Sequence, residues 1–325
     1  MRRVILRRLI YSVPVALIAS IATFALMSFA GSPLSQLESR EPPPSAATIA
    51  AAKKYLRLNQ PLADQYWHWL TGIFTGNWGP SVEHFDIGEM LWQRLLVTMR
   101  LVIVAVLVAM IIAVVVGVIS ASRRYSALDH GLSFVGFLML SMPLFWFAIL
   151  LQQGAIRVNQ ALGSRVLYTQ GEQSIPLPSG FLGATGDIVA HLLLPTLALS
   201  LTTYAAWSRY VRSSTLEVLG ADYIRLARAK GLPRRKILVR HALRTALIPF
   251  ITVVGLDLGT IFSGAVVTET VFQWRGMGDF LVTAIQDYDL YAVMAWLMAV
   301  AGIIIAFNLI ADLLYAVVDP RIRIG

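Results

Sequence analysis

Two acidic residues stand at or within long apolar runs, where a carboxylate could do chemistry. Asp257 lies near the middle of the run Ile248–Val267, and Glu269 follows shortly after its end. A charged side chain that faces lipid is energetically costly, so we expect each residue to turn toward a polar path or a neighbouring protein surface. Each carboxylate could instead accept a structural hydrogen bond from an adjacent helix, an alternative that fits Glu269 better than Asp257.

The residue types required for common enzyme chemistry are missing or scattered. The chain has no cysteine, which excludes disulfides, thiolate nucleophiles and cysteine-type metal sites. Its five histidines follow no metal-ligand spacing, and neither a GxxxxGK[ST] phosphate loop nor a nucleophile elbow occurs. We therefore predict no catalytic residue, no cofactor site and no metal site. If ATP powers a process in which this chain takes part, another chain must bind the nucleotide.

A strongly basic segment, Glu217–Pro249, lies between two apolar runs and is predicted to begin with a helix of two turns. Asp222 is a suitable N-cap residue, and Gly231 stands where a glycine with positive φ ends many helices. A helix this short is marginal in water, so it must dock against something. The proposed docking face comprises Tyr223, Leu226 and Ala227, with Arg225 and Arg228 beside it.

Pro233 suits the first turn of a second helix in the same segment. Four-residue spacing predicts a basic stripe and an apolar stripe along it, formed by Lys236, Arg240 and Arg244 and by Val239, Leu243 and Leu247. A simpler interpretation is that these positive charges only anchor a cytoplasmic loop and touch anionic lipid headgroups.

The composition indicates a membrane protein. Hydrophobic residues make up 57% of the 325 residues and charged residues only 14%. The net charge of +9 could indicate nucleic-acid binding, but the basic residues cluster beside apolar runs, so we expect membrane lipid and no nucleic acid. Six spans are predicted, with Pro143 and Pro195 interrupting the third and fourth: Leu9–Ala30, Leu95–Ile119, Gly131–Gln153, Ile188–Tyr210, Ile248–Val267 and Leu290–Val318.

Charge asymmetry orients these spans. Of the 27 Lys and Arg residues, 18 fall in the segments that we place inside and 8 in those outside, which predicts that both termini are cytoplasmic. The short link Ser120–His130 is then also cytoplasmic. The resulting organisation has four parts: residues 1–30 (N-terminus and first span), 31–94 (an outer-side helical segment), 95–318 (five spans and the loop 212–247) and 319–325 (a cytoplasmic tail).

Several segments resemble one known family in the same order. RSSTLEVLGADYIRLARAKGL followed by HALRTALIP is similar to the cytoplasmic coupling loop of the dipeptide and oligopeptide permease subunits of bacterial ABC importers. LRRLIYSVPV, YLRLNQPLADQYWHWLTGIFTGNWG, MLSMPLFWFAI, GAVVTETVFQWRGMGDFLVTAI and NLIADLLYAVVDPRIR extend the resemblance over nearly the whole chain. In the general importer loop, Glu-Ala-Ala is followed after three residues by Gly. Here Arg225, Leu226, Ala227 and Gly231 align, so the glutamate is absent.

The resemblance implies an all-α polytopic membrane protein with the ABC importer type I permease fold. It implies six transmembrane helices, an outer-side helical segment between the first two, and a coupling helix between the fourth and fifth. Residues Asp222, Tyr223, Arg225, Leu226, Ala227, Arg228 and Gly231 would then couple to an ATPase. The stretch Thr268–Leu281 would fold at the outer mouth, with tight turns at Gly276 and Gly278, and the path or its outer gate would involve Asp257, Glu269, Phe272, Trp274, Gly276 and Gly278.

The resemblance also implies the partners and the location. They are a second, homologous permease subunit, two cytoplasmic subunits that bind ATP and Mg²⁺, and an extracytoplasmic substrate-binding protein, all at the bacterial plasma (inner) membrane. The expected cargo is dipeptides or oligopeptides. Glutathione, nickel chelates or haem are alternatives within the same family, and a secondary transporter that uses Asp257 as a proton site is a rival class.

Overall fold

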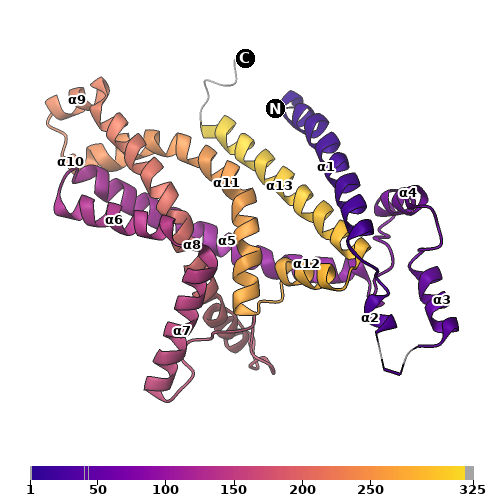
Figure 1. Cartoon of the computed structure of the whole chain (residues 1–325). Helices are drawn as coiled ribbons and strands as arrows, with labels where there is room; N and C mark the ends of the chain where they lie inside the picture. Colours follow the sequence, from indigo (N-terminus) through magenta and orange to yellow (C-terminus); the bar gives the residue numbers. More distant parts are fainter. Residues whose placement is uncertain (1, 40, 43, 319–325) are drawn as a thin grey trace. The chain divides into compact units, whose positions relative to one another are not determined.

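The computed structural model describes residues 2–39, 41–42 and 44–318, and the predicted tail 319–325 lies outside the described residues. Every regular element in the described part is a helix, which confirms the all-α prediction (Figure 1). The elements are α1 (Arg2–Ala30), α2 (Ser35–Glu38), α3 (Ala46–Tyr55), α4 (Leu62–Ile73), α5 (Ile87–Ser122), α6 (Ala127–Ser141), α7 (Leu144–Leu162), α8 (Phe181–Gly220), α9 (Asp222–Ala229), α10 (Arg234–Lys236), the π-helix η1 (Ile237–Ala242), α11 (Leu243–Phe272), α12 (Met277–Gln286) and α13 (Leu290–Val318).

The chain divides into two compact units. The first unit comprises Met1–Thr98 and Arg275–Ala306, and the second comprises Met99–Trp274 and Phe307–Gly325. Helices α5 and α13 each contribute residues to both units. The boundaries of these units differ from those of the predicted segments, because residues 275–306, predicted to belong to segment 95–318, group with residues 1–98.

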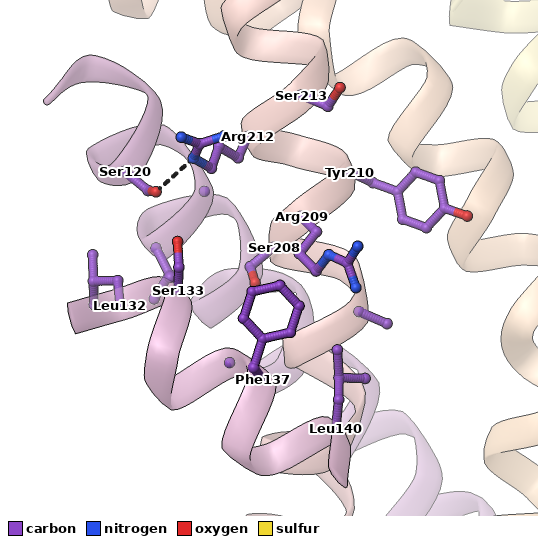
Figure 2. A pocket seen from close by; sticks show the side chains of 14 residues that line it. Ser120, Leu132, Ser133, Phe137, Leu140, Ser208, Arg209, Tyr210, Arg212 and Ser213 are labelled. Carbon is purple, nitrogen blue, oxygen red and sulfur yellow. Dashed lines mark hydrogen bonds between the residues drawn. The ribbon is translucent and has the colours of Figure 1, made fainter. Parts of the chain in front are cut away.

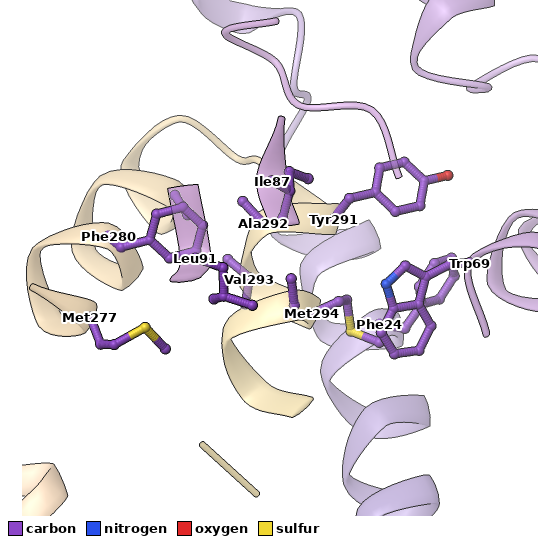
Figure 3. Packing of buried hydrophobic residues seen from close by; sticks show 12 residues of the cluster. Phe24, Trp69, Ile87, Leu91, Met277, Phe280, Tyr291, Ala292, Val293 and Met294 are labelled. Carbon is purple, nitrogen blue, oxygen red and sulfur yellow. The ribbon is translucent and has the colours of Figure 1, made fainter. Parts of the chain in front are cut away.

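The first unit has an apolar core in which α1, α4, α12 and the start of α13 meet. Figure 3 shows Phe24, Trp69 and Met294 close together, and all three are buried. The ring of Tyr66 lies edge-on to Phe24 at 5.4 Å, and its hydroxyl is 2.8 Å from the Oγ of Ser20. Helix α4 thus packs on α1 through Tyr66. Ser45 caps α3, since its Oγ accepts a hydrogen bond from the amide of Thr48.

A buried carboxylate ties the first unit together. Asp289 precedes α13 and accepts hydrogen bonds from the hydroxyl of Ser81 at 2.7 Å and from the amide of Val82 at 2.9 Å. Its other oxygen accepts from the amide of Ala292 at 3.1 Å, which caps the helix. Burial raises the pKa of Asp289, and the hydrogen bond from Ser81 acts in the opposite direction. This network fixes the chain before α5 against the start of α13.

The second unit is built around α8, which packs against α6, α7 and α11 (Figure 1). Helix α5 approaches α8 very closely at Gly117, where an added Cβ would lie 2.7 Å from the carbonyl oxygen of Ser208. Only glycine permits that approach. The long helix α8 therefore has neighbours along much of its length. More than half of the residues in its most hydrophobic 18-residue stretch are buried.

The described residues contain five or six candidate spans. Five helices are long and apolar enough to cross a membrane, and α6 with α7 forms a bent pair that makes a sixth if it counts as one span. The predicted third span, Gly131–Gln153, is interrupted at Pro143 as expected, and the chain turns there by 106° between α6 and α7. Proline restricts the preceding residue to extended conformations, and Met142 has ψ 126°. Pro195, in contrast, lies within a continuous α8.

Candidate functional site

Helix α9 forms where the sequence predicts it, and its end is determined locally. Gly231 has φ +74°, as predicted. Its amide donates to the carbonyl of Arg228 at 2.9 Å, and the amide of Leu232 donates to that of Ala227 at 3.3 Å. These two bonds form a Schellman motif, which satisfies carbonyls at the end of the helix. The start differs from the prediction, because Ala221 is the N-cap and Asp222 is the first helical residue, with no side-chain capping bond.

Helix α9 docks on its own chain through a residue that the sequence analysis did not select. Ile224 is completely buried, in a small cluster with Ile237 and Ala242 of η1. Ala227 is half-buried and packs against the same cluster, so it does not share an outward face with Tyr223 and Leu226. This corrects the predicted face. Ile224 and Ala227 have i, i+3 spacing in the sequence, but Tyr223 and Leu226 have the same spacing, so the spacing alone does not decide which pair faces the chain.

The outward face of α9 keeps two of the three apolar residues proposed for docking. Tyr223 is 46% exposed and Leu226 is 57% exposed. Arg225 and Arg228 are also exposed, and Arg225 pairs with Asp222 at 3.4 Å on the surface. Such an exposed pair contributes little to stability. The helix thus presents two apolar side chains and two cations to whatever lies outside the chain.

The second helix of the loop contains a π-helical segment that four-residue spacing does not predict. Its buried positions are Ile237 and Ala242, five residues apart, because η1 widens the turn between α10 and α11. Ala246 and Phe250 continue the buried stripe at four-residue intervals. Val239, assigned to the apolar stripe, is 58% exposed, so that assignment is wrong. A π-turn contains one residue more than an α-turn and shifts every later residue around the helix.

The base of α8, from which α9 projects, is held by a buried ion pair. The guanidinium of Arg212 donates two hydrogen bonds to the carboxylate of Asp129, with Nε–Oδ1 at 3.0 Å and Nη2–Oδ2 at 2.9 Å. Asp129 is 1% exposed and also accepts from Ser120 and from the amide of Tyr125. Asp129 is not among the predicted site residues, although Ser126 and Asp129 have the spacing of an N-terminal cap.

A groove of about 770 Å³ lies beside this ion pair, between α5, α6 and α8. Figure 2 shows Arg212 directed toward Ser120, whereas Arg209, one turn earlier, lies near Phe137. The guanidinium carbon of Arg209 is 5.0 Å from the centroid of the Phe137 ring, which is a cation–π distance. Arg234 of α10 donates to the carbonyl of Ser122, so the basic loop contacts the end of α5 directly.

Asp257 lies on α11 and bonds to α8. Its Oδ2 accepts a hydrogen bond from the indole Nε1 of Trp207 at 2.8 Å. Trp207 is completely buried, whereas Asp257 is half-buried and lines a groove of about 210 Å³ with residues of α7, α8 and α11. The carboxylate therefore makes the structural hydrogen bond considered above and also borders open space.

The other residues assigned to the path are mostly buried. Glu269, Phe272 and Trp274 are each at most 1% exposed. Helix α11 ends at Phe272, and Gln273, with φ +51°, makes the left-handed turn that was assigned to glycine. Gly276 is the N-cap of α12 with φ −101°, and Gly278 lies inside α12, so neither supplies the predicted tight turn. The segment is a helix end followed by a short helix.

The loop before α8 packs on this helix end. The amide of Gly171 donates to the carbonyl of Phe272 at 2.9 Å, and the side-chain amide of Gln152 donates to the carbonyls of Thr169 and Val271. The bonds to Val271 and Phe272 satisfy carbonyls in the last turn of α11 that have no partner within the helix. Among the described residues, no group of three or more His, Asp or Glu side chains could hold a metal ion.

Comparisons with known proteins agree over the full length of the chain. The family "Binding-protein-dependent transport system inner membrane component" matches residues 113–324, and the corresponding N-terminal family matches residues 1–88. The oligopeptide transport system permease protein OppB of Mycobacterium tuberculosis is 38% identical over 325 residues, which is 100% of both chains. The dipeptide transport system permease protein DppB of Escherichia coli (strain K12) is 36% identical over 343 aligned positions, with 99% of each chain covered.

A solved structure shares the fold. The inward-facing MetNI methionine ABC transporter matches 71% of this chain and 96% of its own chain, with a TM-score of 0.55. Sequence identity in that match is 16%, so the likeness concerns the arrangement of helices alone.

Proposed function

Because the chain belongs to the family of binding-protein-dependent transport system inner membrane components, we propose that it carries dipeptides or oligopeptides as a permease subunit of an ABC importer. Family membership makes it a multi-pass membrane permease with the ABC importer fold. The peptide cargo is supported by the names of relatives that align over the whole chain. Glutathione, nickel chelates and haem are the competing cargoes.

The proposed importer contains four kinds of component. This chain pairs with a second, related permease subunit, and two cytoplasmic subunits bind ATP and Mg²⁺. An extracytoplasmic binding protein delivers the cargo. The sequence supports the division of labour, since it lacks the phosphate-binding loop with which this chain could bind ATP itself.

The proposed orientation places both termini, the link Ser120–His130 and helix α9 in the cytoplasm. The excess of Lys and Arg in these segments supports it.

Coupling to the ATPase subunits is proposed to pass through α9, and the observation that carries this role is the difference between its exposed outer face and its packed inner face. Tyr223 and Leu226 face outward and would enter a cleft on an ATPase subunit, with Arg225 and Arg228 meeting an acidic rim. Ile224 faces inward against η1, which continues directly into α11. A displacement of α9 would therefore push on α11 through packed side chains, because close-packed groups transmit strain.

The test is transport by the complete complex in proteoliposomes. With its binding protein present, the complex should accumulate dialanine inside the vesicles only when its ATPase subunits can reach ATP, and dialanine should stimulate ATP hydrolysis. Glutathione, haem and a nickel chelate serve as comparison cargoes. Uptake that one of these supports and dialanine does not would replace the peptide assignment. Uptake that dissipates a proton gradient without ATP would indicate a secondary transporter.

A further inference from the structure

The groove beside Asp257 is lined by several polar residues and one acidic residue, which packing between helices does not require. It lies within the second unit and is lined by residues of α7, α8 and α11. Its polar members are one carboxylate, one indole and three threonines, and none of the described residues that line it is Lys, Arg or His. The polar residues are Thr202, Thr203, Trp207, Asp257 and Thr260.

The donors in this groove are already used. Thr202 donates its hydroxyl hydrogen to the carbonyls of Ala198 and Leu199, and Thr203 donates to that of Leu199 at 2.7 Å. Thr260 donates to the backbone carbonyl of Asp257 at 2.7 Å.

The indole of Trp207 donates to Oδ2 of the same aspartate. Lone pairs of the hydroxyl oxygens and of the Asp257 carboxylate therefore remain as acceptors. A groove of about 210 Å³ with acceptors and one negative charge favours a ligand that brings donors and a positive charge.

We propose that this groove binds a primary ammonium group, and that in transport this group is the free amino terminus of the peptide. The second half of this inference rests on the proposed cargo. An ammonium ion has three donors and no acceptor, which matches the lining. The half-buried position of Asp257 supports an ionic contact, because reduced solvent screening strengthens the attraction between opposite charges.

The competing role of Asp257 is structural, since the carboxylate could serve only to hold α11 against α8 through Trp207. Two variants separate these roles. Asp257→Asn removes the charge and retains an oxygen that can accept from the indole. Trp207→Phe removes the indole hydrogen bond and retains the charge. If the role of Asp257 is purely structural, Trp207→Phe should impair the groove more than Asp257→Asn does. If the groove binds an ammonium group, Asp257→Asn should weaken the binding of a cation more than Trp207→Phe does.

The first experiment measures the charge preference of the groove in the assembled complex. Thr260 is exposed to the groove, and the chain has no native cysteine, so Thr260→Cys places a unique thiol on this subunit. The reaction rate of this thiol is measured with a cationic reagent, trimethylammonioethyl methanethiosulfonate, and with an anionic one, sulfonatoethyl methanethiosulfonate. Each rate is divided by the rate at which the same reagent reacts with a free thiol in solution, which removes the intrinsic difference between the reagents. We expect a preference of about tenfold for the cationic reagent, which corresponds to one nearby unit charge in a partly solvated groove.

Adding Asp257→Asn should abolish the preference, and adding Trp207→Phe should preserve it. The proposal is overturned if the two reagents react equally with the single Thr260→Cys variant. It is also overturned if Trp207→Phe abolishes the preference while Asp257→Asn leaves it intact.

The second experiment identifies the ligand group. Dialanine should slow the reaction of the same thiol with uncharged N-ethylmaleimide, and N-acetyl-dialanine should not, with Asp257→Asn removing the difference. Equal protection by both compounds overturns the ammonium assignment. Transport of dialanine is measured separately. If dialanine protects the thiol but is not taken up, the proposed cargo is wrong and the ammonium site is still supported. Dialanine uptake without a charge preference refutes the site and leaves the cargo standing.

Discussion

The buried carboxylate of Asp129 depends on its partner Arg212. The carboxylate is 1% exposed, and Arg212 supplies two of the hydrogen bonds that compensate for burial. Arg212→Met removes the cation from a buried carboxylate, but the arginine is 29% exposed and Ser120 and Tyr125 still donate to Asp129, so the free energy of unfolding should fall by about 1–3 kcal/mol. The decrease in unfolding free energy is measured by chemical denaturation of the purified complex, with a probe on this subunit to monitor its unfolding.

The surface pair Arg225–Asp222 provides the matched control, since it joins the same residue types at 3.4 Å in an exposed position. Arg225→Met should produce no measurable change in unfolding free energy. If both arginine variants unfold at the same denaturant concentration as the unmodified protein, the Asp129 pair does not anchor α8 and its assigned role is wrong.

Gly231 presents a different residue-scale requirement, which is conformational and not steric. Its φ is +74°, and no atom lies within 4 Å of where a Cβ would stand. Gly231→Val should therefore destabilise the end of α9 by about 1–2 kcal/mol through backbone strain alone. Gly231→Asn should have a smaller effect, because asparagine tolerates this region. The measurement is the ratio of transported dialanine to hydrolysed ATP, which should fall in the order Gly, Asn, Val.

At the scale of elements, the two faces of α9 make separable predictions. Ile224→Ala removes a completely buried side chain from the cluster with Ile237 and should cost about 2–5 kcal/mol of local stability. Amide hydrogen exchange in α9 should then accelerate. Leu226→Asp adds a charge to an exposed position, so exchange in the isolated subunit should be unchanged while copurification of the ATPase subunits declines.

Ala227→Glu does not separate these effects, because Ala227 is half-buried against its own chain. Val239→Asp, on the exposed side of η1, is the better control and should leave both measurements unaltered. Retention of the ATPase subunits by Leu226→Asp at unmodified stoichiometry would contradict the docking role of the outward face.

The sequence predicts elements well where the determining interactions are local. Gly231 ends α9 as predicted, since this cap depends on residues within a turn of each other. The inward face of α9 could not be predicted, because it depends on Ile237, which η1 brings to Ile224 only in the folded chain. The bond between Trp207 and Asp257 joins residues 50 positions apart, and no periodicity along one helix encodes it.

At the scale of the whole molecule, the proposed topology can be tested by cysteine labelling. Glu83 and Glu217 are both exposed and fall on opposite sides of the membrane in the proposed orientation. Single Glu83→Cys and Glu217→Cys variants should react with an impermeant maleimide from opposite sides of sealed vesicles. Ser81 would be a poor choice, since it is buried and bonded to Asp289. Labelling of both cysteines from one side would refute the orientation.

Hydrophobic runs predict the number of spans because a bilayer fixes their length, but they do not predict shape. Pro143 marks an interruption but not its angle, since the chain bends by 106° at Pro143 whereas Pro195 lies within a continuous α8. The helices also extend beyond the apolar runs. Helix α8 reaches Gly220, ten residues past the predicted end of the fourth span, because Arg212 remains helical while it pairs with Asp129.

The π-helical segment η1 determines where an insertion or deletion can be accommodated. Deleting exposed Val239 would bring Ile237 and Ala242 to four-residue spacing, so a regular helix could still present both to Ile224. A deletion within α11, for example of Thr252, would rotate residues on one side of it by about 100° and disrupt either the contacts of η1 or the face that carries Asp257. Homologous chains that differ in length by one residue between α9 and α11 should therefore have gained or lost it in η1.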